Sequence, residues 1–577
     1  MFNALHGSIR GAMASLFLTT NLQASMKLLY PVILVMLSAC SLSQTTVSTD
    51  VEPNVPQQPK LIIGITVDQM RYDFIDKYWE DFGAGGFKRL VGEGFFARNL
   101  HYNYMPTYTG PGHASIFTGT TPANHGIVAN DWYDRDLKAL MYCAKDDSVK
   151  GVGTMASEGQ RSPVHLLSTT MGDEMKIFSN MRSKVIGIAM KDRGGILPAG
   201  RMADAAYWYI GANEGNWVSS DWYMNTLPQW VQDFNAKKLS DSYLKNGWSL
   251  IKAESVYDES IADNNAFEAP FKGQTKPVFP YNLDSLRSLN LNYDLIKATP
   301  WGNTHTVDFA IATIEGEQMG SDDITDMLCV SFSSTDYIGH QFGIHSRETQ
   351  DCYLRLDADL ERFINFLDGG IGRENYLIFL SADHGGAPTP SYVMKENAAA
   401  GYWKTDSLVS AINHRFEELN YAVRVENYSN DQVFFTTDSL LKYGYNHPFA
   451  QEEACRVAMQ FDGVHMAFTH NELSKQLKRE GMARQVQMGF NQNMSGDVVI
   501  VTEPGWMKYS LQGTTHGSPW VYDTHVPAIF FGFNVKQGES FVKHSITDIA
   551  PTITSLCKLP MPNACTGEPI LEVLQEE

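Results

Sequence analysis

Short, continuous apolar runs that end in an acid recur along the chain. KLIIGITVD at 60–68 ends on Asp68, and NYLIFLSADHGG at 375–386 leads into Asp383 and His384. Runs without polar alternation are typical of strands buried on both faces of a parallel sheet. Because open α/β sheets bind ligands beyond the carboxyl ends of their parallel strands, we expect these polar side chains to lie at one edge of a sheet.

Two further runs have the same form. KVIGIAMKDRGG predicts a strand that continues through Lys191 and Arg193, with Asp192 pointing to the opposite face. DMLCVSFSSTDYIGH predicts a strand running into Asp336 and His340. The pattern therefore places two cations, and a further acid and histidine, near the ends of predicted strands.

Helical periodicity separates these strands. THTVDFAIATIEGE at 304–317 has the spacing of an amphipathic helix, YLRLDADLERFINFLDG predicts a helix that ends at Gly369, and TDIAPTITSLCKL predicts a closing helix. Strands that alternate with helices predict an α/β fold. We expect a doubly wound, mostly parallel central sheet with helices on both faces.

Two stretches differ from the rest of the chain in composition and pattern. Residues from about 211 to 300 are rich in aromatic residues and Asn, and residues from about 390 to 495 contain a helix-like LVSAINHRFEEL and a polar turn, NYSNDQ. We interpret both as cap insertions that shape the substrate pocket, because binding residues concentrate in such segments. The strand DVVIV at 497–501 is expected to return the chain to the core.

The segment PTYTGPGHASIFTG places the hydroxyl of Thr109 at the start of a predicted helix whose early Pro suits the first turn. A helix start offers unpaired N–H groups and a positive dipole end, and the glycines let the backbone approach an anion. A Thr in this position is also an ordinary helix cap. The other polar residues of the chain must decide between a phosphate site and a cap.

Composition narrows the choice of partner. The chain has 577 residues, of which 43% are hydrophobic, so it can bury a large core. Its formal net charge of -20 argues against nucleic acid or an anionic membrane surface as a partner. An anionic substrate would need local positive charge, from metal ions or from a few placed Lys and Arg side chains.

The N-terminal region predicts export. MKLLYPVILVMLSAC at 26–40 has one Lys, an apolar run too short to span a bilayer, and small residues before Cys40. This ending resembles a bacterial lipobox, in which the Cys is lipidated; an ordinary signal peptide is the alternative. We expect an exported, periplasmic protein, with anchoring to the outer membrane as a lipoprotein as the alternative. We expect the chain to have three parts. They are an extension and signal peptide at 1–40, a flexible tether at 41–58, and the catalytic domain at 59–577.

Six cysteines follow Cys40. They are Cys143, Cys329, Cys352, Cys455, Cys557 and Cys565. If any pair forms in an oxidising compartment, Cys557 with Cys565 is expected from closeness in sequence alone, whereas Cys329 lies in an apolar run and is expected to be a buried thiol. The sequence has no CxxC pair, so a bound metal would need Asp and His ligands.

Asp and neutral His are good ligands for zinc and similar divalent ions. The candidates at the predicted strand ends are joined by a loop histidine. The set is Asp68, Asp336, His340, Asp383, His384 and His516. Each one alone is an ordinary feature of a strand end or turn, but their joint occurrence beside Thr109 and a Lys/Arg pair indicates a metal site that binds an anion.

These motifs, in this order, resemble the type I phosphodiesterase/nucleotide pyrophosphatase branch of the alkaline phosphatase superfamily, from about residue 59 to the C-terminus. The matching motifs are Asp68 after a strand, Thr109-Gly-Pro-Gly-His, Asp336-x-x-x-His340, Ala-Asp383-His384-Gly and Thr-His516-Gly. Within the branch, the similarity is greatest to the PafA-type, phosphate-irrepressible alkaline phosphatases. Those enzymes have an Asn after the nucleophile helix and a Lys-x-Arg on a later strand, here Asn130, Lys191 and Arg193.

The resemblance implies an alkaline phosphatase-like fold with two zinc ions (Zn2+) per chain. One ion would be held by Asp336, His340 and His516, and the other by Asp68, Asp383, His384 and the Thr109 oxygen. The resemblance also implies that Thr109 is the nucleophile and becomes a phosphothreonine, while Asn130, Lys191 and Arg193 bind the phosphoryl oxygens. Ligand type alone leaves manganese and iron open as alternatives.

The expected function is hydrolysis of small phosphate monoesters over a broad substrate range, by a monomer with a possible lipid anchor at Cys40. The alternative is a phosphodiesterase or nucleotide pyrophosphatase with the same metals and nucleophile. Lys191 and Arg193 favour monoesters, because they can meet the extra charged oxygen that a monoester carries. A non-catalytic lipoprotein that binds phosphorylated ligands is a third reading, against which the intact set of ligands and nucleophile argues.

Overall fold

The computed structural model describes residues 58–436, 438, 442 and 447–574. The predicted signal peptide, Cys40 and most of the predicted tether lie outside the described residues. Within the described part of the chain, no helix is long and apolar enough to cross a membrane.

The centre of the fold is a set of parallel strands. β1 (Leu61–Val67) pairs in parallel with β9 (Asp326–Phe332) on one side and with β10 (Tyr376–Ser381) on the other. β6 (Val185–Ala189) continues the parallel set beyond β9. Every residue of these four strands is buried, which explains why their sequences are unbroken apolar runs.

Among the described residues, the central sheet has eleven strands in the order β18-β2-β17-β10-β1-β9-β6-β7-β8-β5, with β19 also paired to β2. β17 pairs antiparallel with β10, and β8 pairs antiparallel with β7, so the parallel centre has antiparallel neighbours on both sides. The other strands are β2 (Phe95–His101), β5 (Gly151–Val152), β7 (Ala205–Ile210), β8 (Asn216–Ser220), β17 (His525–Gly532), β18 (Gly538–Ser540) and β19 (His544–Ser545).

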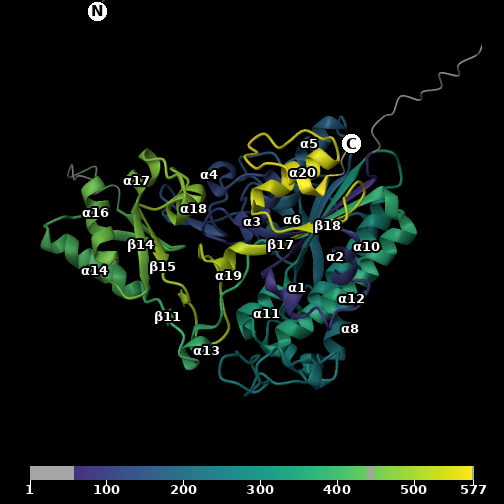
Figure 1. The fold of residues 1–577 in the computed structure, drawn as a ribbon, viewed down its shortest axis with the longest axis horizontal. Helices are drawn as coiled ribbons and strands as arrows, with labels where there is room; N and C mark the ends of the chain where they lie inside the picture. The colour runs from purple at the N-terminus through teal and green to yellow at the C-terminus, as the bar shows by residue number, and fades with distance from the viewer. Residues whose placement is uncertain (1–57, 437, 439–441, 443–446, 575–577) are drawn as a thin grey trace, which may run out of the picture. The chain divides into compact units, whose positions relative to one another are not determined.

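Helices cover both faces of this sheet, as predicted (Figure 1). One layer consists of α3 (Thr109–Thr118), α5 (Met171–Phe178), α6 (Asp192–Ala199) and α20 (Ile549–Leu556). The other consists of α2 (Phe87–Glu93), α10 (Trp301–Glu317), α11 (Ser334–Phe342) and α12 (Arg347–Gly370). The helix predicted to end at Gly369 ends one residue later. Shorter helices complete the core: α1 (Asp73–Lys77), α4 (Pro122–His125), α7 (Gln229–Ala236), α8 (Leu239–Asn246), α9 (Leu283–Leu286), α13 (Pro390–Lys395) and α19 (Val521–Thr524).

A second sheet corrects one prediction. The strand predicted at 497–501 exists as β15 (Val498–Thr502), but it lies in a separate four-stranded sheet of order β12-β13-β15-β14 and not in the central sheet. The other strands are β12 (Val425–Ser429), β13 (Gln432–Phe435) and β14 (Val464–Thr469). An apolar strand buried in either sheet has the same pattern, so the sequence did not distinguish them. We call residues 398–510, which carry this sheet, the cap.

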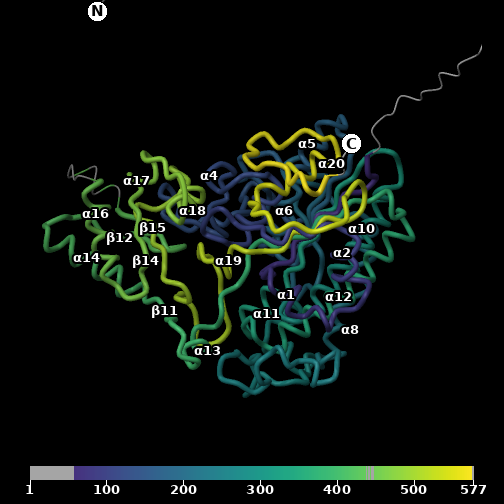
Figure 2. The backbone as a smooth tube through the Cα atoms, in the orientation of Figure 1, coloured from purple at the N-terminus to yellow at the C-terminus, as the bar shows by residue number. Residues whose placement is uncertain are grey.

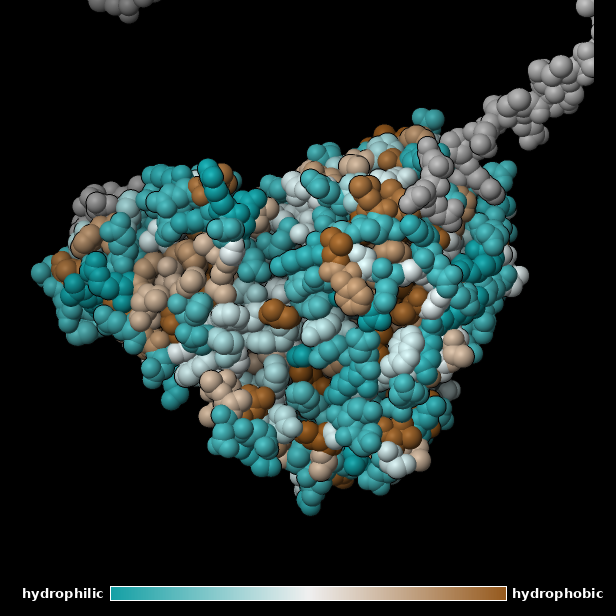
Figure 3. All heavy atoms as spheres, in the orientation of Figure 1, coloured by the Kyte–Doolittle hydropathy of each residue, from teal (hydrophilic) through white to brown (hydrophobic). Residues whose placement is uncertain are grey.

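The cap has its own apolar core. α14 (Thr405–Glu418) and α16 (His447–Ala458) pack together and against the sheet, and α17 (His470–Lys475) and α18 (Gly481–Gly489) follow. The predicted polar turn in NYSNDQ joins β12 to β13, where Asn430 and Asp431 have φ values of 52° and 55°, as expected for a two-residue hairpin turn. The face drawn in Figure 3 is mostly hydrophilic, with moderately hydrophobic residues gathered over β14 and β15.

The chain enters and leaves the cap along adjacent paths (Figure 2). β11 (Gly401–Tyr402) on the way in pairs in parallel with β16 (Trp506–Met507) on the way out. The cap is therefore joined to the core by two neighbouring segments, one following α13 and the other preceding α19.

The six described cysteines all have free thiols, so the expected Cys557–Cys565 pair is not present. Cys557 is buried at the end of α20, whereas the sulfur of Cys565 lies against Gly119 at the end of α3. The two side chains are thus held by different neighbours despite their closeness in sequence. Cys329 is a buried thiol in β9, as predicted.

Candidate active site

The carboxyl ends of three neighbouring strands bring the predicted acids together. Asp68 directly follows β1, Asp383 follows β10, and Asp336 lies in the first turn of α11, just after β9. β9 ends at Phe332, so Asp336 belongs to a helix and not to an extended strand. Because β1, β9 and β10 are parallel and in register, their ends lie at the same edge of the sheet.

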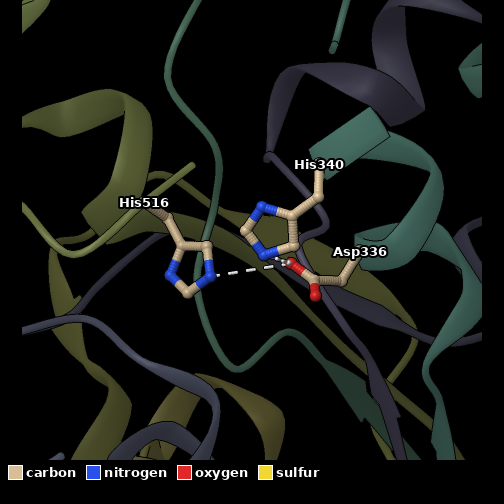
Figure 4. A group of neighbouring side chains, drawn as sticks. All are labelled: Asp336, His340 and His516. Atoms are coloured by element: carbon tan, nitrogen blue, oxygen red, sulfur yellow. Dashed lines mark ion pairs between the residues drawn. The ribbon is translucent and has the colours of Figure 1, made fainter. Parts of the chain in front are cut away.

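Asp336 and His340 lie one turn apart on α11, and His516 faces them from the loop before α19 (Figure 4). The His340 Nε2 atom is 3.2 Å from Asp336 Oδ1, and the His516 Nε2 atom is 3.6 Å from the same oxygen. One potential ligand atom from each of the three residues lies within 4.8 Å of the others, a spacing that could hold a metal ion.

A second group adjoins the first. Asp68, Asp336 and His384 also have ligand atoms within 4.8 Å of one another, and the His384 Nε2 atom is 3.4 Å from carboxylate oxygens of both Asp68 and Asp383. The imidazole rings of His384 and His516 stack with centroids 3.4 Å apart. Asp336 therefore contributes to both groups, which form one continuous cluster.

The three imidazoles are oriented by the backbone. Each Nδ1 atom lies 2.7 or 2.8 Å from a backbone carbonyl oxygen, so this nitrogen carries the proton and donates it. The pairs are His340 with Thr514, His384 with Gly385, and His516 with Thr107. Each Nε2 lone pair is consequently left free to face the carboxylates, which is how metal-binding histidines are commonly held.

Unpartnered polar atoms in this cluster fit a metal site. Asp68 Oδ1, Asp383 Oδ2 and His384 Nε2 are buried and have no hydrogen-bond partner among the described residues. All three residues are 0% exposed. Leaving such groups unpaired in a protein interior is costly, and a divalent cation would satisfy an Asp/His donor set of this kind.

The electrostatics differ from one ligand to the next. Burial raises the pKa of Asp68; although burial opposes the charge of His340, the neighbouring Asp336 raises its pKa. Burial lowers the pKa of His384 well below its usual range and that of His516 to about 3, which keeps both imidazoles neutral. Burial, together with the neighbouring Asp68, raises the pKa of Asp383. Although burial opposes ionisation of Asp336, His340 and Lys191 hold its pKa well below the ordinary value. Neutral histidines beside ionised carboxylate are the forms that bind metal.

Thr109 is the first residue of α3, and the residue before it, Tyr108, is the N-cap. It is 1% exposed. The third residue after it, Gly112, lets α3 approach the cluster closely, since a Cβ atom there would lie 2.2 Å from the Asp383 carbonyl oxygen. The start of α3 is therefore packed against the loop that carries Asp383 and His384.

Lys191 lies among the predicted metal ligands. Its Nζ atom donates to Asp68 Oδ2 at 2.6 Å and forms a short ion pair with Asp336. Burial opposes its charge, but these two carboxylates raise the pKa of Lys191, so it stays protonated. The side chain links the end of β1 to the start of α11.

The strand predicted through Arg193 ends earlier, at Ala189, and Asp192 begins α6. Asp192 therefore does not point away from Arg193. It accepts hydrogen bonds from Tyr142 and Arg161, and Tyr142 Oη in turn accepts one from Arg193 Nη1 at 3.2 Å. Two glycines and a Pro within 192–199 weaken the helical signal, which explains the error.

The expected phosphate-binding residues Arg193 and Asn130 both approach Thr109. Arg193 Nη2 lies 3.5 Å from Thr109 Oγ1. Asn130 Oδ1 accepts a hydrogen bond of 2.7 Å from the backbone N–H of Gly110, the residue after Thr109. The structure thus brings the nucleophile candidate, both donors and the Asp/His cluster into one site.

Sequence reasoning missed two residues of this site. Gln69 donates through Nε2 to Asp336 Oδ1 at 2.6 Å and through its backbone N–H to Asp383 Oδ1 at 3.1 Å. Its position directly after Asp68 was a signal. Tyr142, at the end of β4 (Ala139–Tyr142), which pairs with β3 (Asp131–Asp134), had no local signal because its partners Asp192 and Arg193 are about 50 residues away.

Two cavities border the site. The larger, of about 270 Å³, is lined by both Lys191 and Arg193 and by Tyr142; we call it the Arg193 cavity. The smaller, of about 140 Å³, is lined by His516 and by Tyr108, the residue before Thr109; we call it the His516 cavity. Groups bound at the centre can thus extend in two directions.

Comparisons with known proteins agree with this geometry. The sequence profile of the type I phosphodiesterase / nucleotide pyrophosphatase family matches residues 62–526. "Alkaline phosphatase PafA" of Elizabethkingia meningoseptica is 40% identical over 526 residues, which covers 90% of this chain and 95% of that protein. "Alkaline phosphatase PhoV" of Synechococcus elongatus is 39% identical, with 92% and 96% covered. A protein named "Calcium-transporting ATPase" of Myroides odoratus is 42% identical, with 90% and 95% covered.

Comparison with solved structures also finds similarity to alkaline phosphatase PafA. The crystal structure of wild-type alkaline phosphatase PafA matches this chain with a TM-score of 0.87 at 38% identity, covering 90% of this chain and 100% of that one. A PafA variant in which a Thr, an Asn, a Lys and an Arg are substituted matches with the same values. Thr109, Asn130, Lys191 and Arg193 have these residue types in the same order along the chain.

Proposed function

The chain belongs to the type I phosphodiesterase / nucleotide pyrophosphatase family, and from this premise we propose that it is an exported alkaline phosphatase that hydrolyses phosphate monoesters. Two relatives named alkaline phosphatase, each about 40% identical over most of both chains, support the activity. The structure supports it through the buried cluster at the strand ends, which has the donor types that a metal-dependent phosphatase needs.

We propose two zinc sites in this cluster. Asp336, His340 and His516 would hold one ion, and Asp68, Asp383, His384 and the Thr109 oxygen would hold the other. When bound, such a pair of ions lowers the pKa of a nearby hydroxyl and stabilises charge on the attacking and leaving oxygens of an in-line displacement. The unpartnered atoms of Asp68, Asp383 and His384 support this assignment.

Thr109 performs the nucleophilic step. After losing its hydroxyl proton to a hydroxide ion from solvent, Oγ1 attacks phosphorus and the bond from phosphorus to the ester oxygen breaks. The alcohol leaves with a proton from water, which regenerates the hydroxide. Water then attacks the phosphothreonine, which breaks the bond between phosphorus and Oγ1 and releases phosphate. The buried position of Thr109 at the start of α3 supports this role.

The single observation that carries the monoester assignment is the placement of Arg193. Its guanidinium approaches Thr109 Oγ1 to 3.5 Å, where the transferred phosphoryl group must lie. A guanidinium can donate to two phosphoryl oxygens at once, and a monoester has one more charged oxygen than a diester. Lys191 and Asn130 add donors beside it.

Export, an anchor at Cys40, a monomeric state and a broad substrate range complete the proposal. The sequence motif before Cys40 supports export. The competing assignment to a phosphodiesterase would require the second ester group of the substrate to occupy the space near Arg193, where the charged donors favour oxygen.

The deciding experiment is the ratio of kcat/KM for p-nitrophenyl phosphate to that for bis-p-nitrophenyl phosphate, measured on zinc-loaded protein. We expect a ratio far above one. A ratio below one would assign the chain to the diesterases of the family. Zinc content measured on the same sample checks the proposed two ions per chain, and absence of turnover despite bound zinc would favour a binding protein.

A further inference from the structure

The His516 cavity lies between the cap and the core. The core contributes Tyr108, His516 and Tyr522, and the cap contributes Tyr428 and Trp506. These aromatic side chains come from segments far apart in the sequence, so the cavity depends on the contact between the two parts. Its volume of about 140 Å³ is of the size of a small ring system.

The core wall is fixed directly beside the chemistry. The ring of Tyr108 packs edge to face on the imidazole of His516, with centroids 5.6 Å apart. Gly517, with φ 126°, makes this contact possible, because a Cβ atom there would lie 2.5 Å from the Tyr108 ring. The Tyr108 ring thus ties this wall of the cavity to His516, whose Nε2 atom lies 3.6 Å from Asp336.

The cap wall is held equally firmly. Tyr428 Oη accepts a hydrogen bond of 2.9 Å from Trp403 and donates one of 3.0 Å to Asp431. Trp506 packs against two glycines, Gly401 and Gly463, neither of which has room for a side chain beside the indole. The aromatic surface is therefore ordered before any ligand binds, which reduces the entropy cost of binding.

The charged side chains that line the His516 cavity are mostly acidic. Asp431 and Asp523 line the cavity, whereas Lys508, which also lines it, is exposed to solvent. Asp523 is 1% exposed; its Oδ2 accepts three hydrogen bonds from Gly517 and Ser518, and its Oδ1 has no partner among the described residues. The Nζ atom of Lys508 lies 6.0 Å from the centroid of the Tyr428 ring, so the lining has two acids against this one cation. The balance disfavours an anion, and Asp523 Oδ1 can accept a donated hydrogen bond.

We propose that the His516 cavity binds the alcohol portion of the phosphate ester and, within a broad substrate range, favours uncharged aromatic alcohols. The inference rests on the proposed function. In an in-line displacement the leaving oxygen lies opposite the nucleophile. The Thr109 oxygen is proposed to share an ion with Asp68, Asp383 and His384, so the group of Asp336, His340 and His516 would face the leaving oxygen. The cavity begins at His516. Aromatic rings packed in such a cavity gain contact beyond simple burial.

The test compares phenyl phosphate with methyl phosphate. Tyr428→Leu, which removes an aromatic wall but retains an apolar side chain, should lower the ratio of kcat/KM for phenyl to methyl phosphate by about fivefold. Trp222→Leu is the matched control, because Trp222 lies on Arg201 and lines neither cavity. Binding can also be measured without turnover. In Thr109→Ala protein, calorimetry gives the affinity for phenylphosphonate relative to that for methylphosphonate. Adding Tyr428→Leu should lower this relative affinity by a similar factor.

The outcomes separate the two proposals. If wild-type protein hydrolyses neither ester, the proposed function fails. If it hydrolyses both and Tyr428→Leu retains the wild-type ratio, the subsite is rejected and the phosphatase remains. Should Tyr428→Leu fail to fold, Lys508→Glu at an exposed position takes its place. It should raise the preference for phenyl over 4-carboxyphenyl phosphate about threefold, and an unchanged preference would reject the subsite.

Discussion

The Arg193 cavity and the His516 cavity border the same cluster but differ in charge. The first is lined by four cations, Arg161, Lys191, Arg193 and Lys297, against three acids. The second is lined by Asp431 and Asp523, with Lys508 exposed. Arg161 and Lys297 are ion-paired with Asp192 and Asp294, respectively, and Lys191 with Asp68 and Asp336. Arg193 has no ion pair among the described residues, so it is the cation on this side that a strongly acidic protein can offer to a phosphoryl dianion.

The difference also suggests a division of labour. Groups that touch the phosphoryl oxygens decide between monoesters and diesters, whereas groups around the alcohol decide which monoester reacts fastest. The two sides meet at Thr109, which lies 3.5 Å from Arg193 and directly follows Tyr108. Substitutions on the two sides should therefore produce losses of different kinds.

The largest loss is expected at the centre. Thr109→Ala removes the proposed nucleophile and should lower kcat by roughly 10⁴-fold or more, because no phosphothreonine can form. The remaining Asp and His side chains should still hold metal, so zinc measured by mass spectrometry should stay close to the wild-type content. Ordinary turnover in this variant would remove Thr109 from the mechanism.

The next loss distinguishes the Arg193 side. Lys191→Ala combined with Arg193→Ala should lower kcat/KM for p-nitrophenyl phosphate by roughly 10²-fold or more, and that for bis-p-nitrophenyl phosphate far less, since the diester lacks the extra charged oxygen. Arg182→Ala is the control, because Arg182 donates to the Ser179 carbonyl and lines neither cavity. Equal losses on both substrates would mean that the pair does not recognise this charge.

Much of this arrangement was predictable from sequence. Unbroken apolar runs identify β1, β9 and β10, and an acid at or soon after each run indicates the edge where ligands bind. Parallel pairing then forces those ends together. The fold class and the grouping of Asp68, Asp336 and Asp383 follow from patterns that local sequence contains.

Other features depend on contacts that local sequence does not contain. Two glycines and a Pro weaken the helical signal of α6, so the predicted strand was extended through Arg193 and the side on which Asp192 lies was mispredicted. The apolar pattern of β15 suits either sheet, and only its pairing partners assign it to the cap. The His516 cavity was unpredictable for the same reason, since Tyr108 and Tyr428 are brought together only by the packed chain.

A smaller loss should reveal how Arg193 is positioned. Tyr142→Phe removes the hydroxyl that accepts from Arg193 and donates to Asp192, so the guanidinium loses one of its fixed partners. We expect about a fivefold fall in kcat/KM for monoesters. In an Arg193→Ala background the same substitution should have almost no further effect, and a full, additive loss there would place Tyr142 in direct contact with substrate.

The smallest effect concerns stability outside both cavities. Glu268 and Glu348 are 0% exposed, each has one unpartnered oxygen, and burial raises the pKa of both carboxyls. A carboxyl with a raised pKa binds more protons in the folded than in the unfolded state, so the free energy of unfolding falls as pH rises above 4.5, the ordinary pKa of a Glu carboxyl.

The Glu268→Gln side chain cannot ionise, so this variant should not show the fall in the free energy of unfolding. Its Tm relative to wild type should rise by about 1 to 3 °C between pH 6 and pH 9, while Glu396→Gln at an exposed position should show no such trend. A constant difference across this range would show that Glu268 ionises alike in both states, and unchanged kcat/KM in the variant would separate this stability effect from the chemistry of the two cavities.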